Sequence, residues 1–129
     1  MHDTQYDTPV VLVVEDDPML SLNATTIVED AGFVVVRARD AETAVDILLQ
    51  RADIRIVFAD LDVPGSMKGL DFAASIRDRW PPIDLILTSS RVAVSIDALP
   101  ARAVFVAKPY RPDQITILLH RFEDRASAD

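Results

Sequence analysis

The chain has 129 residues, half of them apolar, with no cysteine and a formal net charge of −8 at pH 7. This length fits one domain, spanning 1–129 with a core at about 9–123 between polar tails, and excludes a catalytic domain joined to a separate substrate domain. The missing cysteine excludes disulfides and thiolate catalysis, and the acidity with singly scattered arginines argues against direct nucleic-acid binding. No apolar run approaches the roughly 18 residues of a membrane helix, so we expect a cytoplasmic protein without membrane insertion.

The first predicted element is a strand at Val10–Val14, which is apolar at every position. Such a run is typical of a parallel sheet whose two faces are both covered. The strand ends at an acidic loop that begins with Glu15. Asp17 is expected to cap a helix that starts at Pro18, and Gly32 is expected to end that helix. The predicted order is therefore strand, acidic loop and helix.

The same order recurs along the rest of the chain. Further strands are expected at 33–36, 54–59, 85–87 and 103–107, with helices after Asp40, after Gly69 and from about Pro112. The segment at 92–99 is too short, and too close to Pro100, for a full helix. This alternation predicts an α/β fold, a doubly wound five-stranded parallel sheet flanked by helices.

Polar residues directly follow the predicted strands. They are Glu15 and Asp16 after the first strand, Asp60 after the third, Thr88 after the fourth and Lys108 after the fifth, whereas the second is followed only by Arg37. Taken singly, each fits an ordinary helix cap, turn or loop residue. Ligands of an open parallel sheet bind outside the carboxyl ends of its strands, so we expect these residues to converge. Together they predict a magnesium site, because close carboxylates repel without a cation and an oxygen-rich site suits Mg²⁺.

The stretch around Asp60 and Asp62 leaves two chemistries open. In the first, a metal-held Asp60 carboxylate accepts a phosphoryl group, Lys108 offsets the charge of the phosphoryl oxygens and Thr88 donates a hydrogen bond to one of them. In the second, Asp60 and Asp62 are the nucleophile and the acid of a small phosphatase with an Asp-x-Asp motif. Both chemistries make position 60 the reacting carboxylate.

From about Val10 to Phe122 the chain resembles the receiver domains of response regulators in two-component signalling. That family has a flavodoxin-like fold of five strand-and-helix units, (βα)5. The residues that carry the resemblance are Glu15-Asp16, Asp60, Pro64, Gly69, Thr88 and Lys108-Pro109.

The resemblance implies roles for individual residues. Asp60 would be the phosphoacceptor, and Thr88 and Lys108 would bind the phosphoryl group. Phe105 stands where the family has an aromatic residue that reorients with the threonine, and it equally fits an ordinary core residue. The implied ligands of Mg²⁺ are Glu15 and Asp16, directly or through water, Asp60, and the backbone carbonyl of Asp62.

The resemblance also implies a function, which is a phosphorylation-dependent signalling switch rather than an enzyme. The phosphodonor would be a sensor histidine kinase or a histidine phosphotransfer protein. Output would pass by protein contact to a downstream target or through a homodimer. The short polar stretch after Phe122 leaves no room for a DNA-binding module, so we expect a stand-alone receiver. A phosphorelay shuttle and a degenerate receiver are variants of this hypothesis.

Three features depart from the family pattern. The loop at 64–69 is one residue longer, which predicts an altered loop shape rather than lost chemistry. The short segment at 92–99 predicts a reduced output face. Asp62 adds a carboxylate two residues after Asp60, and we expect its side chain to tune the lifetime of the phosphoryl group.

Two rival classes fit the chain less well. A haloacid-dehalogenase-type phosphatase would use Asp60 and Asp62, but that family has its acidic metal pair after the lysine, whereas Glu15-Asp16 comes first here. A flavodoxin-like cofactor binder needs a phosphate-binding loop after its first strand, and this loop is acidic. His120, in the last predicted helix, is interpreted as a solvated residue rather than a phosphodonor.

Overall fold

The computed structural model describes residues 9–63, 69–91 and 94–128, with side chains described as far as 125. Two of the predictions from the sequence concern residues outside these ranges. Pro64 and the loop shape over 64–68 lie outside the described residues, and so do the first two residues of the segment at 92–99.

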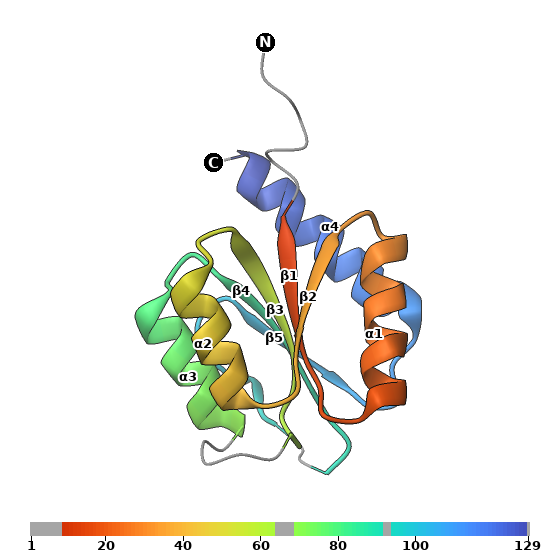
Figure 1. Cartoon of the computed structure of the whole chain (residues 1–129), viewed down its shortest axis with the longest axis horizontal. Helices are drawn as coiled ribbons and strands as arrows, with labels where there is room; N and C mark the ends of the chain where they lie inside the picture. The colour runs from red at the N-terminus through yellow and green to blue at the C-terminus, as the bar shows by residue number, and fades with distance from the viewer. Residues whose placement is uncertain (1–8, 64–68, 92–93, 129) are drawn as a thin grey trace.

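Five parallel strands form one sheet in the order β2-β1-β3-β4-β5. Helices α2 and α3 cover one face of this sheet, and α1 and α4 cover the other (Figure 1). This arrangement confirms the predicted doubly wound α/β fold. The strands are β1 (Val10–Val14), β2 (Val34–Ala38), β3 (Ile54–Asp60), β4 (Asp84–Ser89) and β5 (Ala103–Ala107). The helices are α1 (Pro18–Asp30), α2 (Ala41–Gln50), α3 (Gly69–Arg79) and α4 (Pro112–Ala128).

Two aspartates begin helices as predicted. The Asp17 carboxylate accepts hydrogen bonds from the backbone amides of Met19 and Leu20, at 2.9 and 3.0 Å, and the helix starts at Pro18. The Asp40 carboxylate accepts from the amide of Thr43 at 2.7 Å. These contacts satisfy amides that have no partner inside the helix, which explains why α1 and α2 start there.

Strand β1 divides its side chains between two hydrophobic cores. Leu12 and Val14 pack on the side of α2 and α3, whereas Val11 and Val13 pack on the side of α1 and α4. All four are almost fully buried. Because successive side chains of a strand point to opposite faces, a strand covered on both faces is apolar throughout, as the sequence of β1 indicates.

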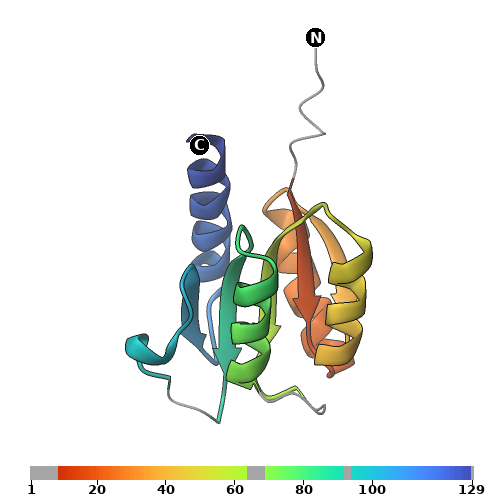
Figure 2. The same ribbon diagram turned by 90° about the vertical axis from the view of Figure 1, so that its left-hand side faces the viewer.

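The chain between β4 and β5 departs from the regular alternation. Its described part holds only a single 3-10 turn, η2 (Ile96–Ala98), which stands out from the β5 edge of the molecule (Figure 2). The expectation that this segment is too short for a full helix is confirmed, so the (βα)5 pattern lacks its fourth α-helix here. Ile96 is 85% exposed as a result. Among the helices of the described ranges, none is long and apolar enough to cross a membrane.

Arg77 fastens the end of α3 to the starts of β4 and β5. Its guanidinium donates to the carbonyl oxygens of Ala101 (2.6 Å), Pro81 (2.7 Å) and Ile83 (2.5 Å). These oxygens belong to the loops before β4 and β5. Arginine suits this place because its rigid fork of donors reaches several acceptors at once.

Replacing Arg77 by methionine should destabilise the protein by about 2–4 kcal/mol, because three carbonyl oxygens lose a charged donor. Arg77→Lys should recover only part of this loss, since one ammonium cannot reach all three oxygens. Urea unfolding, followed by circular dichroism and by the fluorescence of the single tryptophan, Trp80, measures the change. Arg121→Met, on the exposed side of α4, is the matched control. Equal stabilities of the Arg77→Met and Arg121→Met variants would contradict the anchoring role.

Candidate functional site

The carboxyl ends of β1, β3, β4 and β5 bring the predicted polar residues to one edge of the sheet. Asp60, the last residue of β3, is 8% exposed and lies opposite Thr88 of β4 in the strand register. Glu15 follows β1 directly and is 7% exposed, and its backbone amide donates to the Ala38 carbonyl at 3.0 Å. The chain crosses from one side of β1 to the other at this point of the sheet, where open α/β sheets bind ligands.

Lys108 joins the two buried carboxylates. Its ammonium Nζ lies 2.5 Å from Oδ2 of Asp60 and 3.4 Å from Oε1 of Glu15. Its backbone amide donates to the Ser89 carbonyl at 3.1 Å, which holds the end of β5 beside the end of β4. Burial works to lower the pKa of Lys108, but the bonds and attraction to the two carboxylates outweigh it and raise that pKa. The ammonium is therefore held charged between Asp60 and Glu15.

The site carries more negative charge than Lys108 offsets. Burial raises the pKa of Glu15 from its ordinary value of 4.5 to about 7, and the neighbouring Asp60 adds to the rise, against the backbone bond from Asp17 and the attraction of Lys108. In this state Glu15 holds its proton more tightly than an ordinary glutamate does. A divalent cation beside Glu15 and Asp60 would relieve the same repulsion.

Thr88 supplies a hydroxyl with no acceptor. The side chain is 2% exposed, and its Oγ1 has no hydrogen-bond partner within the described residues. It lines the same narrow hollow as Glu15 and Asp60. A buried hydroxyl without a partner is costly, so this donor suits an acceptor that arrives later, such as an oxygen of a group attached to Asp60.

Asp62 takes part in the site through its backbone and through its side chain. Its amide donates to Oδ1 of Asp60 at 2.8 Å. Its carboxylate accepts from the hydroxyl of Ser89 (2.7 Å) and from the amide (3.0 Å) and hydroxyl (3.1 Å) of Ser90. Burial opposes ionisation of Asp62, but the bonds from the two serines prevail and lower its pKa. The sequence indicated the extra charge of Asp62 but not these partners.

The carboxylates of this site suit Mg²⁺ better than a cation that requires all of its ligands from protein side chains. Asp16 is exposed and lines a shallow depression together with Glu15, Arg37 and Arg39. Within the ranges that the structure describes, no three acidic or histidine side chains stand close enough to enclose a metal ion. Mg²⁺ usually keeps several waters and takes only one or two carboxylates, and oxygen is the only donor type here. The donor set therefore fits this ion.

Phe105 was named as a candidate switch residue from the sequence, whereas Tyr110 was not. Phe105 is half buried, lies opposite Leu87 in the register and packs against the core on the α2 and α3 side. Its role as a switch stays a prediction.

Tyr110 was not anticipated from the sequence. Its ring packs against Phe58 with centroids 5.6 Å apart and lines the hollow that holds Thr88. An aromatic residue two positions after Lys108 was the available signal for it.

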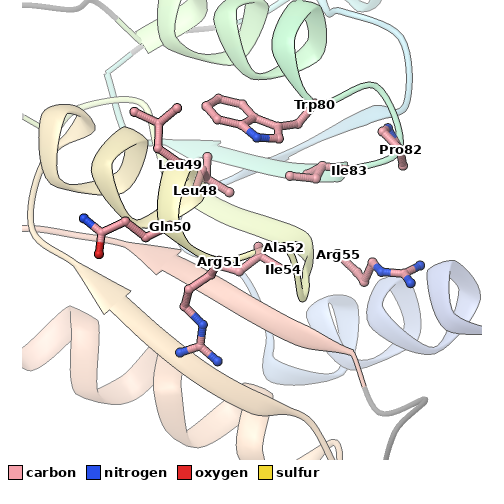
Figure 3. Close-up of a pocket in the computed structure, with 10 residues that line it drawn as sticks. All are labelled: Leu48, Leu49, Gln50, Arg51, Ala52, Ile54, Arg55, Trp80, Pro82 and Ile83. Carbon is pink, nitrogen blue, oxygen red and sulfur yellow. The ribbon is translucent and has the colours of Figure 1, made fainter.

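A separate hollow lies at the opposite end of the sheet, between the ends of α2 and α3 (Figure 3). Leu48, Leu49 and Trp80 form its apolar wall, and Arg51 and Arg55 stand at its rim. None of the residues that line it carries a carboxylate. It therefore offers no phosphoryl acceptor and is distinct from the carboxylate site. His120, also remote from the carboxylates, is exposed and its Nε2 contacts the Ala31 carbonyl at 2.9 Å.

The model of the response regulator receiver domain family matches residues 11–120 of this chain. Among curated proteins, the chain is 27% identical over 115 residues to the nitrogen assimilation regulatory protein NtrX of Azorhizobium caulinodans, covering 86% of this chain and 25% of that protein. It is 23% identical over 112 residues to the transcriptional regulatory protein FixJ of Bradyrhizobium diazoefficiens, covering 84% and 54%. The chain thus spans about a quarter to about half the length of these relatives.

Solved structures agree on the fold. The receiver domain protein from Clostridium thermocellum superposes with a TM-score of 0.84 at 20% identity, covering 93% of this chain and 98% of that one. The receiver protein from Sinorhizobium medicae gives a TM-score of 0.83 at 20% identity, covering 92% and 97%. Similarity at this level of identity establishes the fold alone.

Glu15→Gln should stabilise the metal-free protein at pH 7.5. The folded pKa of about 7 lies above the ordinary 4.5, so the folded state binds this proton more tightly, and the contribution of Glu15 to stability falls as pH rises from about 4.5 to about 7. Glutamine removes the ionisation beside Asp60 and Lys108. We expect a gain of about 1–3 kcal/mol at pH 7.5 that shrinks towards pH 5.

Urea unfolding in the presence of a chelator measures this effect at both pH values. Glu29→Gln, at an exposed position of α1, is the control and should show no such pH-dependent gain. A Glu15→Gln variant less stable than the natural protein at pH 7.5 would show that the buried carboxylate is not a source of repulsion.

Proposed function

The chain belongs to the response regulator receiver domain family, and we propose that Asp60 accepts a phosphoryl group from a phosphohistidine. The donor would be a sensor histidine kinase or a histidine phosphotransfer protein. One observation carries this proposal, which is the buried Asp60 carboxylate held between the ammonium of Lys108 and the amide of Asp62. That geometry fixes a nucleophilic oxygen at the ligand-binding edge of the sheet.

The transfer balances without a further reactant. An oxygen of the Asp60 carboxylate forms a bond to phosphorus, and the bond from phosphorus to the histidine nitrogen breaks. The nitrogen keeps the electron pair and takes up a proton. Lys108 offsets the charge of the phosphoryl oxygens, and the unpartnered Thr88 hydroxyl donates to one of them.

Glu15 and Asp16, directly or through water, Asp60 and the backbone carbonyl of Asp62 would hold Mg²⁺, and the bound ion would supply positive charge to the site. The role of the chain's own residues is to position and to neutralise. Glu15 and Asp60 supply the buried negative charge that attracts the cation. Asp16 is exposed and therefore open to a hydrated ion.

The surface next to Lys108 suits contact with another protein. Met19 and Leu22 on α1 are 74% and 55% exposed, and Leu20 is 43% exposed. Leu20, Ser90, Lys108 and Tyr110 line a hollow beside the site. Exposed apolar side chains on the helix that contributes Leu20 to this hollow favour a protein donor over a small metabolite. A downstream protein or a second copy of the chain would then read the phosphorylated surface.

The geometry disfavours the phosphatase alternative. A general acid must present a protonated carboxyl to the leaving group, but the carboxylate of Asp62 accepts three hydrogen bonds from Ser89 and Ser90. These bonds keep it ionised, and its pKa is lowered despite partial burial. Asp62 is therefore poorly suited to donate a proton beside Asp60.

Incubation with acetyl phosphate should add one phosphoryl group to the natural protein when Mg²⁺ is present. The Asp60→Asn variant should gain none, because the nucleophilic carboxylate is gone. Intact mass spectrometry measures the addition, and Asp53→Asn, which removes an exposed carboxylate paired with Arg51, is the control that should react normally. Rapid multiple-turnover release of phosphate from many monoesters would favour the phosphatase. No addition from any donor would indicate a degenerate receiver.

Asp62→Asn should lengthen the lifetime of the phosphoryl group by about 3- to 10-fold, because a negative charge close to the acyl phosphate is removed. Loss of the phosphoryl mass after removal of the donor gives the rate. Asp97→Asn, at an exposed position of η2, is the matched control. Equal rates for the natural protein and Asp62→Asn would refute a role for this side chain in setting the lifetime.

A further inference from the structure

We propose that Asp62, Ser89 and Ser90 form a latch that restrains the segment after Thr88 and opens when Asp60 carries a phosphoryl group. This inference rests on the proposed function. It assigns a positioning role to Ser89 and Ser90, which the phosphotransfer chemistry itself does not require. The latch would set how readily Thr88 reaches the phosphoryl group, and so how strongly the switch responds.

The contacts of the latch join two strands that are adjacent in the sheet. Asp62 follows β3, and Ser89 and Ser90 lie at the end of β4. Three donors converge on one carboxylate, from the Ser89 hydroxyl at 2.7 Å and from the Ser90 amide and hydroxyl at 3.0 and 3.1 Å. The Ser89 hydroxyl also accepts from the Arg91 amide at 3.1 Å, which extends the restraint along the chain. Hydrogen bonds to a charged acceptor are stronger than those between neutral groups.

Thr88 precedes the latch serines in the chain and lies opposite Asp60 in the strand register. Its carbonyl accepts from the Leu61 amide at 2.7 Å, while the next residue, Ser89, is held by Asp62. The Thr88 hydroxyl is buried in the hollow that it shares with Asp60, and none of the residues that the structure describes accepts a hydrogen bond from it. In the unphosphorylated state, therefore, the chain that follows this hydroxyl is restrained, while no described residue accepts a hydrogen bond from the hydroxyl itself.

A phosphoryl group on Asp60 would act on the Thr88 hydroxyl and on the Asp62 carboxylate at the same time. It replaces the single charge of the carboxylate by about −2, a net gain of about one negative charge, and it brings acceptor oxygens that attract the Thr88 hydroxyl. The added negative charge repels the carboxylate of Asp62. Asp62 is close enough for this, because its backbone amide donates to Asp60 and its carboxylate is attracted by Lys108. The new bond to Thr88 forms as the bonds of the latch weaken. A local change of charge thereby selects between two arrangements of one loop.

Ser90→Ala separates the latch from simple charge effects, because it removes one donor and leaves every charge in place. The probe is beryllium trifluoride with Mg²⁺, an anion that stands in for a phosphoryl group on a carboxylate. If the latch opposes the phosphorylated arrangement, Ser90→Ala should bind this probe about 3- to 10-fold more tightly than the natural protein. Titration followed by the backbone amide nuclear magnetic resonance signals of positions 88 and 90 measures the affinity of both proteins. Ser95→Ala, an exposed serine before η2 with no side-chain capping bond, is the control and should bind as the natural protein does.

A double variant tests whether the residues act together. Asp62→Ala alone should tighten probe binding, and adding Ser90→Ala to it should have no further effect, because both changes break the same contact. Additive effects, or an unchanged or weakened affinity of Ser90→Ala, would overturn the latch.

Different measurements would contradict the latch and the proposed function. Amide hydrogen exchange at Ser90, measured without any phosphodonor, should be faster in Asp62→Ala than in the natural protein, because that amide loses its acceptor. Unchanged exchange overturns the latch even where the natural protein takes up phosphoryl groups normally. The proposed function is overturned instead if the natural protein neither accepts a phosphoryl group from acetyl phosphate nor binds beryllium trifluoride.

Discussion

A single ammonium between two buried carboxylates organises the functional end of this protein. Lys108 comes from the end of β5, Asp60 from the end of β3 and Glu15 from the end of β1, so their contact requires the sheet to be assembled in its observed order. Two buried acids share one base, and burial, to which the neighbouring Asp60 adds, raises the pKa of Glu15. The same imbalance attracts a divalent cation and makes the surrounding loops sensitive to one more negative group.

The two ends of the sheet are built for different tasks. At the amino ends of the strands, Arg77 binds three loop carbonyls, and the buried Asp84 pairs with Arg102 and Arg125, which fastens α3 and α4 to the sheet. At the carboxyl ends, the Thr88 hydroxyl has no acceptor among the described residues, and Asp62 holds the next loop by side-chain bonds. Because the amino ends of the strands are held by these contacts, a change of charge at the carboxyl ends can alter loop contacts there without disturbing the core.

The sequence predicted most of the fold because its signals are local. Asp17 caps α1 for the reason that its position suggested, and the short segment before Pro100 formed only η2. Side-chain partners from distant segments were not predictable in the same way. Nothing near Asp62 in the chain indicated that Ser89 and Ser90 would be its partners, since the contact spans 27 and 28 residues. The place of Tyr110 against Phe58 likewise depends on how α4 packs across the sheet.

By itself the sequence determined the alternation of strands and helices and the order of acidic, hydroxyl and basic residues at the strand ends. It did so because strand pattern, caps and strand-end polarity are properties of short stretches of chain. Only the tertiary structure decided that Lys108 reaches both Asp60 and Glu15 and that Asp62 turns towards the serines. It also decided that Thr88 is buried where no described residue accepts from its hydroxyl. Those outcomes depend on burial and on distances between strands that are remote in the chain, which appear only when the sheet is formed.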